Sequence, residues 1–228
     1  MAYPSAPWQL HGFAIQTVHL LDIDRVRPLI PSELEIVPVF PGKTLGGIYL
    51  SSYQSGSALL YNELIVVTAL VAEAGKVGGW VSHIYVDNPD SVAGGREIWG
   101  LPKELAQFNW QPVDQSGQPS QVGQPLSVQV TQGEDVLCRC RCTWQLPGWQ
   151  QKLSVPAFSL QRDKLLIFDA QTDSRVQIVG VELEVPTESP FSWLKIGHPW
   201  LGVYANPLNL LVHTPRVLKE RSRTYSYS

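Results

Sequence analysis

The sequence is poor in charged residues. Only 16% of its 228 residues are Asp, Glu, Lys or Arg, against roughly 25% in an average soluble domain. Much of the surface is therefore expected to be weakly polar or covered by other subunits, which favours a homo-oligomer. The formal net charge is −3 and no cluster of lysines or arginines is present. Without a basic footprint for a phosphate backbone, we expect no nucleic-acid partner.

Long hydrophobic runs are also missing. The longest strongly apolar run, residues 64–72 (LIVVTALVA), is far shorter than the ~20 residues that span a bilayer. The N-terminal MAYPSAPWQLHG lacks the basic-then-apolar order of a signal peptide. We expect no membrane span and a cytoplasmic location.

Cysteine is scarce, and its spacing argues against a metal site. Cys138, Cys140 and Cys142 alternate with arginines in VLCRCRCTW, which is the period of a strand with all three thiols on one face. The paired CxxC spacing typical of zinc is missing, so we expect buried core residues in a reducing compartment.

No GxSxG motif supports Ser-His-Asp catalysis. We expect neither metal nor cofactor, and structural roles for the scattered histidines His11, His19, His83, His198 and His213.

The sequence does contain signals for β-structure from end to end. Runs rich in β-branched and aromatic residues are bounded by Gly, Pro, Asn or Asp. Helical signal is best in residues 20–36, where Asp22 can cap a short helix that Pro28 or Pro31 ends. Because so many strands must hide their edges, we predict a mainly β (α+β) fold: an antiparallel β-barrel or double sheet with few short helices. The predicted strand regions are 42–53, 62–73, 78–89, 124–144, 174–186 and 207–218.

The chain shows no internal repeat, and its 18 prolines and 18 glycines are spread as turn punctuation. We therefore predict a single domain over residues 1–218. The last ten residues, 219–228 (KERSRTYSYS), are polar and without pattern, so we expect a frayed or interface-seeking tail.

One lysine stands in unusual company. In GGREIWGLPKEL, Lys103 follows Pro102, with Trp99 and Leu101 as apolar neighbours. Lysine has an ordinary pKa near 10.4 and is almost fully protonated at pH 7, so a lysine that attacks carbonyls needs surroundings that disfavour the ammonium. Pro102 biases Leu101 towards an extended backbone, and the alternation in LAQFNWQ predicts a strand just beyond Lys103. The same letters are also compatible with an ordinary exposed turn.

These residues resemble a known signature. GREIWGLPKEL is similar to the element of the acetoacetate decarboxylase superfamily in which Gly-Arg-Glu, an apolar spacer and Pro-Lys present a Schiff-base lysine. Lys103 falls on that lysine, and Tyr61 and Glu63 in YNELIV match the family's Tyr-x-Glu. Residues 19–36 match its N-terminal helix and the Pro-x-x-Leu-x-Ile that follows. With residues 209–218, the similarity of order and spacing covers nearly the whole chain.

The resemblance implies a lyase. In the family a β-keto acid condenses with the lysine, the iminium takes up the electrons left when carbon dioxide departs, and hydrolysis frees the ketone. It implies Lys103 and Glu63 as catalytic residues. Substrate-binding candidates are Tyr61, Arg96, Trp99 and Leu101, although Arg96 and Glu97 beside two glycines more often fix a turn, and an isolated Glu63 at a strand start is also compatible with a solvated charge.

Three features depart from the classical decarboxylases. Glu104 replaces the second lysine that follows the Schiff-base lysine, and it would stabilise the ammonium if it faced the same pocket. On a strand, however, neighbouring side chains point to opposite faces. The pocket arginine of the classical enzymes falls near Gly12, with no arginine before Arg25, and a second family glutamate is missing around residues 45–48. Acetoacetate itself is therefore a poor candidate substrate.

The phrases GKTLGGIYLSSY, YNELIVVTALV and GGREIWGLP resemble most the plant neoxanthin-deficiency branch of the superfamily, which is tied to carotenoid metabolism. Two functions follow. One is a Schiff-base enzyme that decarboxylates a β-keto acid or acts on a related carbonyl compound. The other is a non-catalytic binding protein for a hydrophobic, isoprenoid-like ligand in the same cavity. A pocket that encloses Lys103 together with Glu63 would favour the enzyme.

Overall fold

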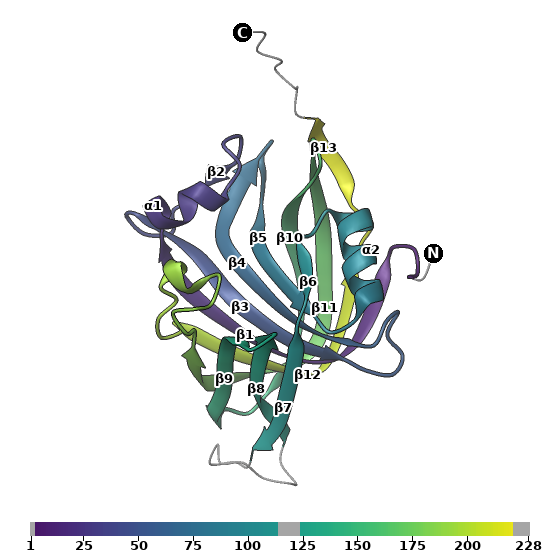
Figure 1. The fold of residues 1–228 in the computed structure, drawn as a ribbon, viewed down its shortest axis with the longest axis vertical. Coiled ribbons are helices and arrows are strands. Elements are labelled where there is room, and N and C mark those ends of the chain that lie inside the picture. The colour runs from purple at the N-terminus through teal and green to yellow at the C-terminus, as the bar shows by residue number, and fades with distance from the viewer. Residues whose placement is uncertain (1–2, 114–123, 221–228) are drawn as a thin grey trace.

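The structure is a computed structural model that describes residues 3–113 and 124–220. Thirteen strands dominate these residues, and the helices are few and short (Figure 1). The helices are α1 (Ile23–Val26), α2 (Pro89–Trp99) and the 3₁₀ helices η1 (Arg27–Leu29) and η2 (Ser192–Leu194). The strands are β1 (Trp8–Asp22), β2 (Glu35–Ile36), β3 (Lys43–Tyr53), β4 (Tyr61–Glu73), β5 (Lys76–Val86), β6 (Lys103–Leu105), β7 (Gln107–Val113), β8 (Gln124–Gln132), β9 (Asp135–Gln145), β10 (Trp149–Gln161), β11 (Lys164–Glu184), β12 (Leu201–Val212) and β13 (Arg216–Glu220).

Seven strands form a closed ring of hydrogen-bonded neighbours. Their order is β10-β5-β4-β3-β1-β12-β11, and β11 pairs again with β10. The long strand β11 serves two sheets, because residues 164–176 pair with β10 and residues 179–184 pair with β9. A second leaf, β9-β8-β7, extends from there. The predicted mainly β fold is confirmed, as a ring that continues into a second sheet.

Most strand pairs are antiparallel, as predicted, and two pairings of β5 are parallel. Strand β5 pairs in parallel with β6, where Ile84 lies opposite Lys103, and in parallel with β10 at Ala157 and Phe158. Both partners reach β5 through long connections, and α2 lies in the connection between β5 and β6. Parallel pairing requires such a crossover, and the strand pattern alone does not reveal it.

The helix expected after Asp22 is present. Asp22 occupies the N-cap of α1, and the following 3₁₀ turn contains Pro28 and ends before Pro31. The Asp22 side chain, however, makes no capping hydrogen bond and instead accepts one from Lys43 Nζ at 2.6 Å. The predicted short helix is confirmed, while its capping interaction is not.

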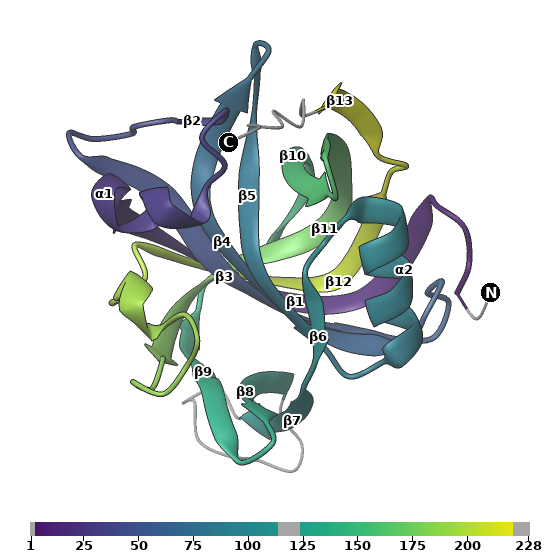
Figure 2. The same cartoon turned by 45° about the horizontal axis from the view of Figure 1, so that its top comes forward.

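Helix α2 was not predicted, and residues 94–97 belong to this helix and not to a turn. Asn88 caps it by accepting from the backbone N–H groups of Asp90 and Ser91, and Pro89 opens its first turn. Gly100 ends it in the left-handed conformation at φ +63°, which suits glycine. The helix lies beside β6 and the N-terminal end of β1 (Figure 2).

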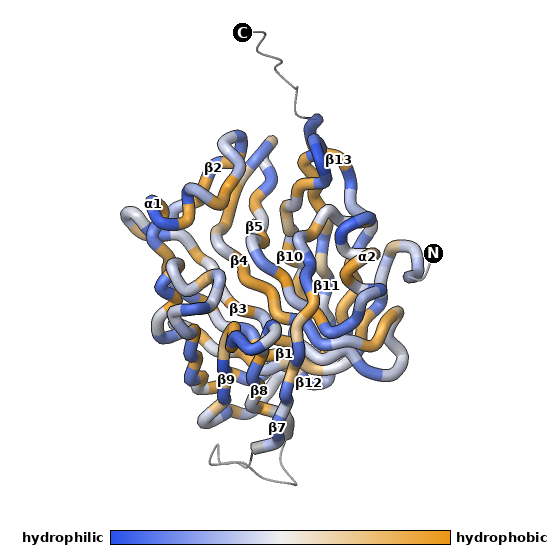
Figure 3. Tube along the Cα trace, in the orientation of Figure 1, coloured by the Kyte–Doolittle hydropathy of each residue, from blue (hydrophilic) through white to orange (hydrophobic). Residues whose placement is uncertain are grey.

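Two groups of buried apolar residues fill the molecule, and hydrophobic stretches run along the central strands such as β4 (Figure 3). The larger group includes Cys138, Cys140 and Cys142, all buried on β9 as predicted. Burial raises the pKa of Cys138 and Cys142 to about 12 and also raises that of Cys140 well above its usual value. These thiols are core residues in the structure.

Strand β13 reaches into the polar end of the chain. Strand β13 pairs with β11 and continues through Lys219 to Glu220, two residues beyond the predicted domain boundary. Residues 221–228 of the expected tail lie outside the described residues. Within the described ranges, no helix combines the length and apolar character needed to cross a membrane.

Candidate active site

The backbone around Lys103 is held by helix α2. After Gly100 the chain turns at Pro102, with the Lys103 N–H donating to the Leu101 carbonyl at 2.8 Å, and β6 begins at Lys103. The Arg96 guanidinium Nε donates to the Lys103 carbonyl at 2.8 Å. The predicted turn-to-strand junction is therefore present, and Arg96 contacts the lysine's backbone.

The Lys103 side chain is enclosed together with a carboxylate. Lys103 is 3% exposed and Glu63 is 4% exposed. The ammonium nitrogen Nζ donates to Glu63 Oε1 at 2.7 Å and to Ser91 Oγ at 3.0 Å. These partners come from β6, β4 and α2, so three separate elements converge on one amine.

Aromatic rings and a glycine complete the enclosure. Nζ lies 4.8 Å from the Tyr61 ring centroid and 5.8 Å from that of Trp8. Trp8 packs edge-on against the buried Trp99 at a centroid distance of 4.7 Å. Gly95 of α2 touches the lysine's methylene chain: a Cβ added there would lie 2.5 Å from Lys103 Cδ and 2.7 Å from Cε. The helix can pass this close because position 95 carries no side chain.

A chain of tyrosine hydroxyls continues from the carboxylate. Tyr53 OH donates to Glu63 Oε2 at 3.1 Å, and the hydroxyls of Tyr49 and Tyr53 lie 3.3 Å apart. Burial raises the pKa of both tyrosines well above the usual value, and the charge of Glu63 adds to the effect. The same causes raise the pKa of Tyr61. The phenols therefore stay protonated, so that Tyr53 can donate to Glu63.

The buried pair is suited to proton transfer. Taking an ammonium and a carboxylate out of water is costly for both ions. A shift of one proton from Nζ to Oε1 across the 2.7 Å hydrogen bond turns two buried ions into a neutral amine and a neutral acid. Transfer of one proton can thus produce a neutral, nucleophilic amine without a large movement of either side chain.

A pocket of about 530 Å³ lies next to this pair. Its lining includes Tyr53 and Tyr61, whose rings are 4.7 Å apart. Tyr53 also bonds to Glu63, and the Tyr61 ring also contacts the lysine. The two tyrosines therefore stand between the pocket and the Lys103–Glu63 pair.

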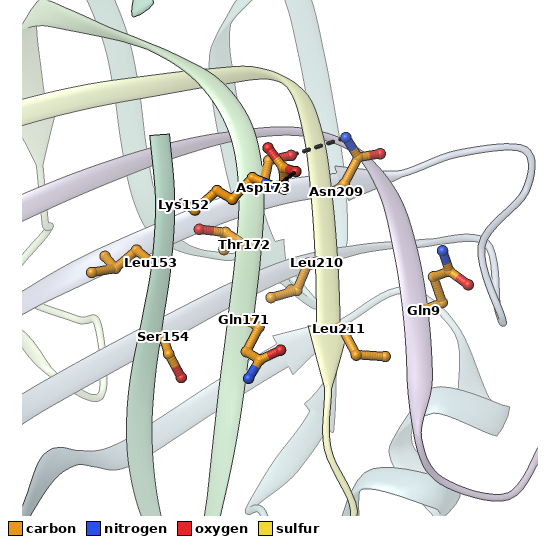
Figure 4. A pocket seen from close by; sticks show the side chains of 10 residues that line it. All are labelled: Gln9, Lys152, Leu153, Ser154, Gln171, Thr172, Asp173, Asn209, Leu210 and Leu211. Carbon is orange, nitrogen blue, oxygen red and sulfur yellow. Dashed lines mark hydrogen bonds and ion pairs between the residues drawn. The ribbon is translucent and has the colours of Figure 1, made fainter. Parts of the chain in front are cut away.

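A second pocket, of about 540 Å³, crosses strands β1, β12, β11 and β10 (Figure 4). Unlike the described part of the first pocket, it has a lysine in its lining, Lys152, which pairs with Asp173 at 2.9 Å. The Lys152 side chain is 78% exposed, so water solvates its ammonium. This pocket offers no sheltered amine.

The structure also locates the departures from the classical family pattern. Glu104 is exposed, where its carboxylate accepts from Gln132 Nε2 at 3.0 Å, while Lys103 beside it is buried. The two side chains face opposite sides, as the strand argument predicted. Gly12 leaves no space for an arginine, because a Cβ there would overlap the Ser52 carbonyl oxygen.

The sequence-based candidates do not all reach the amine. Tyr61 and Glu63 lie against it, Trp99 and Leu101 belong to the same buried cluster, and Arg96 is exposed beyond its backbone contact. Sequence reasoning missed several residues of the site. The period-two alternation in GIYLSSY could have placed the β3 tyrosines on the face of Glu63. The missed residues are Trp8, Tyr49, Tyr53, Ser91 and Gly95.

No group of three or more His, Cys, Asp or Glu residues in residues 3–113 and 124–220 is arranged to hold a metal ion.

Solved structures with the same fold include acetoacetate decarboxylase from Legionella pneumophila, with a TM-score of 0.76 and 17% identity over 96% of this chain and 90% of that one. Another is the enduracididine biosynthesis enzyme MppR in complex with pyruvate, with a TM-score of 0.75 and 15% identity over 97% of this chain and 93% of that one. At these identities the likeness concerns the fold alone.

Curated relatives include the protein NEOXANTHIN-DEFICIENT 1 of Solanum lycopersicum, 33% identical over 109 residues, and that of Oryza sativa subsp. japonica, 25% identical over 204 residues. The matches cover 48% and 76% of this chain. This chain spans only 37% of the tomato protein's length and 67% of the rice protein's. The family model described as acetoacetate decarboxylase matches residues 1–177. The chain therefore belongs to the acetoacetate decarboxylase family.

Proposed function

We propose that this protein is a lysine-dependent enzyme in which Lys103 forms an imine with a carbonyl compound. The observation that carries the proposal is the buried contact of 2.7 Å between Lys103 Nζ and Glu63 Oε1. A structural lysine is usually solvated, whereas this one lies under a helix whose Gly95 makes room for its methylene chain. The family's decarboxylases support the same assignment.

The reaction begins with proton transfer from Nζ to Glu63. The free amine attacks the substrate's carbonyl carbon, and the resulting carbinolamine loses its oxygen as water by taking a proton from Glu63. In a β-keto acid, the electrons of the bond to the carboxylate then pass to the iminium, which releases carbon dioxide and leaves an enamine. Protonation of the enamine carbon and hydrolysis free the ketone and the amine.

The tyrosines support this role of Glu63. A hydrogen bond from Tyr53 to Oε2 keeps the carboxylate oriented, so that Oε1 points at the amine. Tyr53 is a positioning residue in this proposal, since its hydroxyl touches Glu63 and not the reacting nitrogen.

The enclosure also bears on the alternative function, a binding protein for an isoprenoid-like ligand. Such a protein would have its lysine at the rim of a wide apolar cavity. Here the lysine is 3% exposed and hydrogen-bonded to a carboxylate and a hydroxyl. This arrangement favours catalysis over passive binding. The relation to the neoxanthin-deficiency proteins makes carotenoid metabolism a setting for the enzyme.

The proposal is tested by borohydride reduction in the presence of a panel of keto acids and ketones, followed by peptide mass mapping. We expect a stable adduct on the peptide that carries Lys103 and none in the variant Lys103→Met. Lys152 is the internal control, because it is a lysine beside a pocket but in contact with water. Labelling of Lys152 or of several surface lysines, with Lys103 unmodified, would contradict the proposal.

The cytoplasmic location, the homo-oligomer and the single domain over residues 1–218 stay predictions. They enter the proposal only as its expected setting.

A further inference from the structure

The pocket next to Tyr53 and Tyr61 is negatively charged. Among its described lining residues, the only groups charged at neutral pH are Asp87 and Asp90. Asp87 accepts two hydrogen bonds from Asn62, at 2.7 Å from the backbone N–H and 2.6 Å from Nδ2, which holds its carboxylate in place. Asp90 lies in the first turn of α2, directly before Ser91, whose hydroxyl contacts Lys103. Both carboxylates thus line the pocket that Tyr53 and Tyr61 separate from the amine.

The buried pair does not balance these charges. Lys103 and Glu63 neutralise each other at 2.7 Å, and an iminium on Lys103 would carry the same single positive charge as the ammonium. The classical arginine falls near Gly12, where the backbone of β3 leaves no space for a side chain. A carboxylate on the substrate would therefore meet two carboxylates with no unpaired cation lining the described pocket.

One feature of the pocket would favour an anionic substrate. The N-terminus of α2 lies at the same pocket and contributes about half a positive charge. Its first N–H groups are already occupied, because Asn88 Oδ1 accepts from Asp90 and Ser91 at 2.8 and 3.4 Å. Half a charge with engaged donors does not offset two full negative charges.

We infer that the substrate of this site is an uncharged ketone or aldehyde and not a keto acid. The inference rests on the proposed imine chemistry of Lys103 and selects among its substrates. Carboxylate oxygens accept hydrogen bonds but cannot donate them, so Asp87 and Asp90 suit a substrate that brings hydroxyl groups. The charge that would repel an acid is thereby a means of recognition for a hydroxylated neutral compound.

An uncharged substrate changes what the iminium does. With no carboxylate to release, the iminium accepts the electron pair of a carbon–hydrogen bond on the adjacent carbon. The proton of that bond passes to the Glu63 carboxylate, and an enamine remains. Reversal of the step returns a proton to the carbon, and in deuterated water it returns a deuteron.

The experiment compares acetoacetate with its methyl ester, in which a methyl group on the carboxyl oxygen removes the negative charge. Each compound is incubated with the full chain, and borohydride reduces any imine that forms. The rate of adduct formation on Lys103 is followed by mass spectrometry. The rate with the ester is divided by the rate with the acid, and this ratio is divided by the same rate ratio measured with Nα-acetyllysine. The division corrects for the different intrinsic reactivity of the two compounds. We expect a corrected ratio of roughly tenfold or more in favour of the ester at low salt, decreasing as ionic strength screens the carboxylates.

Three variants locate the effect. Asp90→Asn should lower the corrected ratio, and Asp87→Asn should do so independently, so that one variant still tests the inference if the other fails to fold. Glu104→Gln removes the same charge from the exposed side of β6 and should leave the ratio unchanged. An acid that labels Lys103 as fast as the ester, or a ratio insensitive to both aspartates, overturns the inference and leaves the imine chemistry standing. If neither compound labels Lys103, the proposed function fails and the inference fails with it.

Discussion

The substitution Gly95→Ala tests how tightly the helix positions Lys103. The new Cβ would lie 2.5 Å from Lys103 Cδ, 2.7 Å from Cε and 3.1 Å from Cγ. Carbon atoms in contact normally stay about 3.5 to 4.0 Å apart, so the methylene chain must move by about 1 Å. Its end is tied to Glu63 and Ser91, and the movement therefore displaces Nζ from its partners.

The expected cost falls on reactivity more than on stability. Misplacing a reacting group by about 1 Å can lower a rate about 100-fold, and we expect a loss of that order in the rate of borohydride trapping. Overpacking costs about 1 to 3 kcal/mol, while replacing glycine by alanine in a helix returns about 1 kcal/mol. The free energy of unfolding in urea should therefore fall by no more than about 2 kcal/mol.

Gly94→Ala is the matched control in the same helix. Its Cβ would first meet the Trp8 ring at 2.7 and 2.8 Å and Tyr3 at 3.0 Å, whereas a Cβ at position 95 first meets the lysine. We expect a similar loss of stability with a much smaller loss of trapping. If Gly95→Ala traps carbonyl compounds at the wild-type rate, or if both variants lose trapping equally, the argument for a helix-positioned lysine is refuted.

Three further predictions concern buried ionisable groups. Glu63→Gln leaves the Lys103 ammonium without its partner at 2.7 Å and should lower the free energy of unfolding by about 3 to 5 kcal/mol; adding Lys103→Met should recover most of it in urea titrations, and strict additivity would contradict the pairing. Burial lowers the pKa of His19 to about 4 from 6.5. Below pH 6.5 the unfolded chain binds a proton that the buried ring does not bind, so the free energy of unfolding should fall by about 3 kcal/mol between pH 6.5 and pH 4. His19→Gln should remove that part of the pH slope, and an unchanged slope would assign it to other groups. Burial raises the pKa of Cys138 to about 12, so a disulfide reagent should label it only in denaturant, and fast labelling of the native protein would show that β9 opens.

Much of the sheet could be predicted because its strands carry local signals. The run Lys43–Tyr53 and the alternation of Cys138, Cys140 and Cys142 have the period of a strand, and both are strands in the structure. The short helix after Asp22 was also visible, since Pro28 and Pro31 bound it. These features depend on residues that are neighbours in the sequence, so they can be read from the sequence alone.

The missed elements depend on distant contacts or on weak local preference. Helix α2 contains Gly94 and Gly95, which disfavour a helix, although Asn88, Pro89 and Gly100 mark its ends. The glycines are explained by what packs on them, the ring of Trp8 and the chain of Lys103. The pattern of one segment does not reveal such contacts.

The candidate site divides in the same way. The resemblance to the family located Lys103, Tyr61 and Glu63, which the structure brings together. The contacts of Trp8 and Ser91 with the amine join residues that are far from it in the sequence. Burial of the lysine is likewise a property of the assembled ring and helix, so the choice between an exposed turn and a sheltered amine required the structure.

The most direct test of the central claim is exchange of the substrate's carbonyl oxygen with water. An imine on Lys103 forms only if that oxygen leaves as water, and hydrolysis of the imine replaces it with an oxygen from solvent. In water enriched in oxygen-18, we predict that the protein accelerates incorporation of the label into a ketone it accepts, and that Lys103→Met reduces the rate to that of the uncatalysed hydration. Turnover of a substrate by the wild-type protein without exchange of its carbonyl oxygen, or equal exchange by Lys103→Met, would contradict the account.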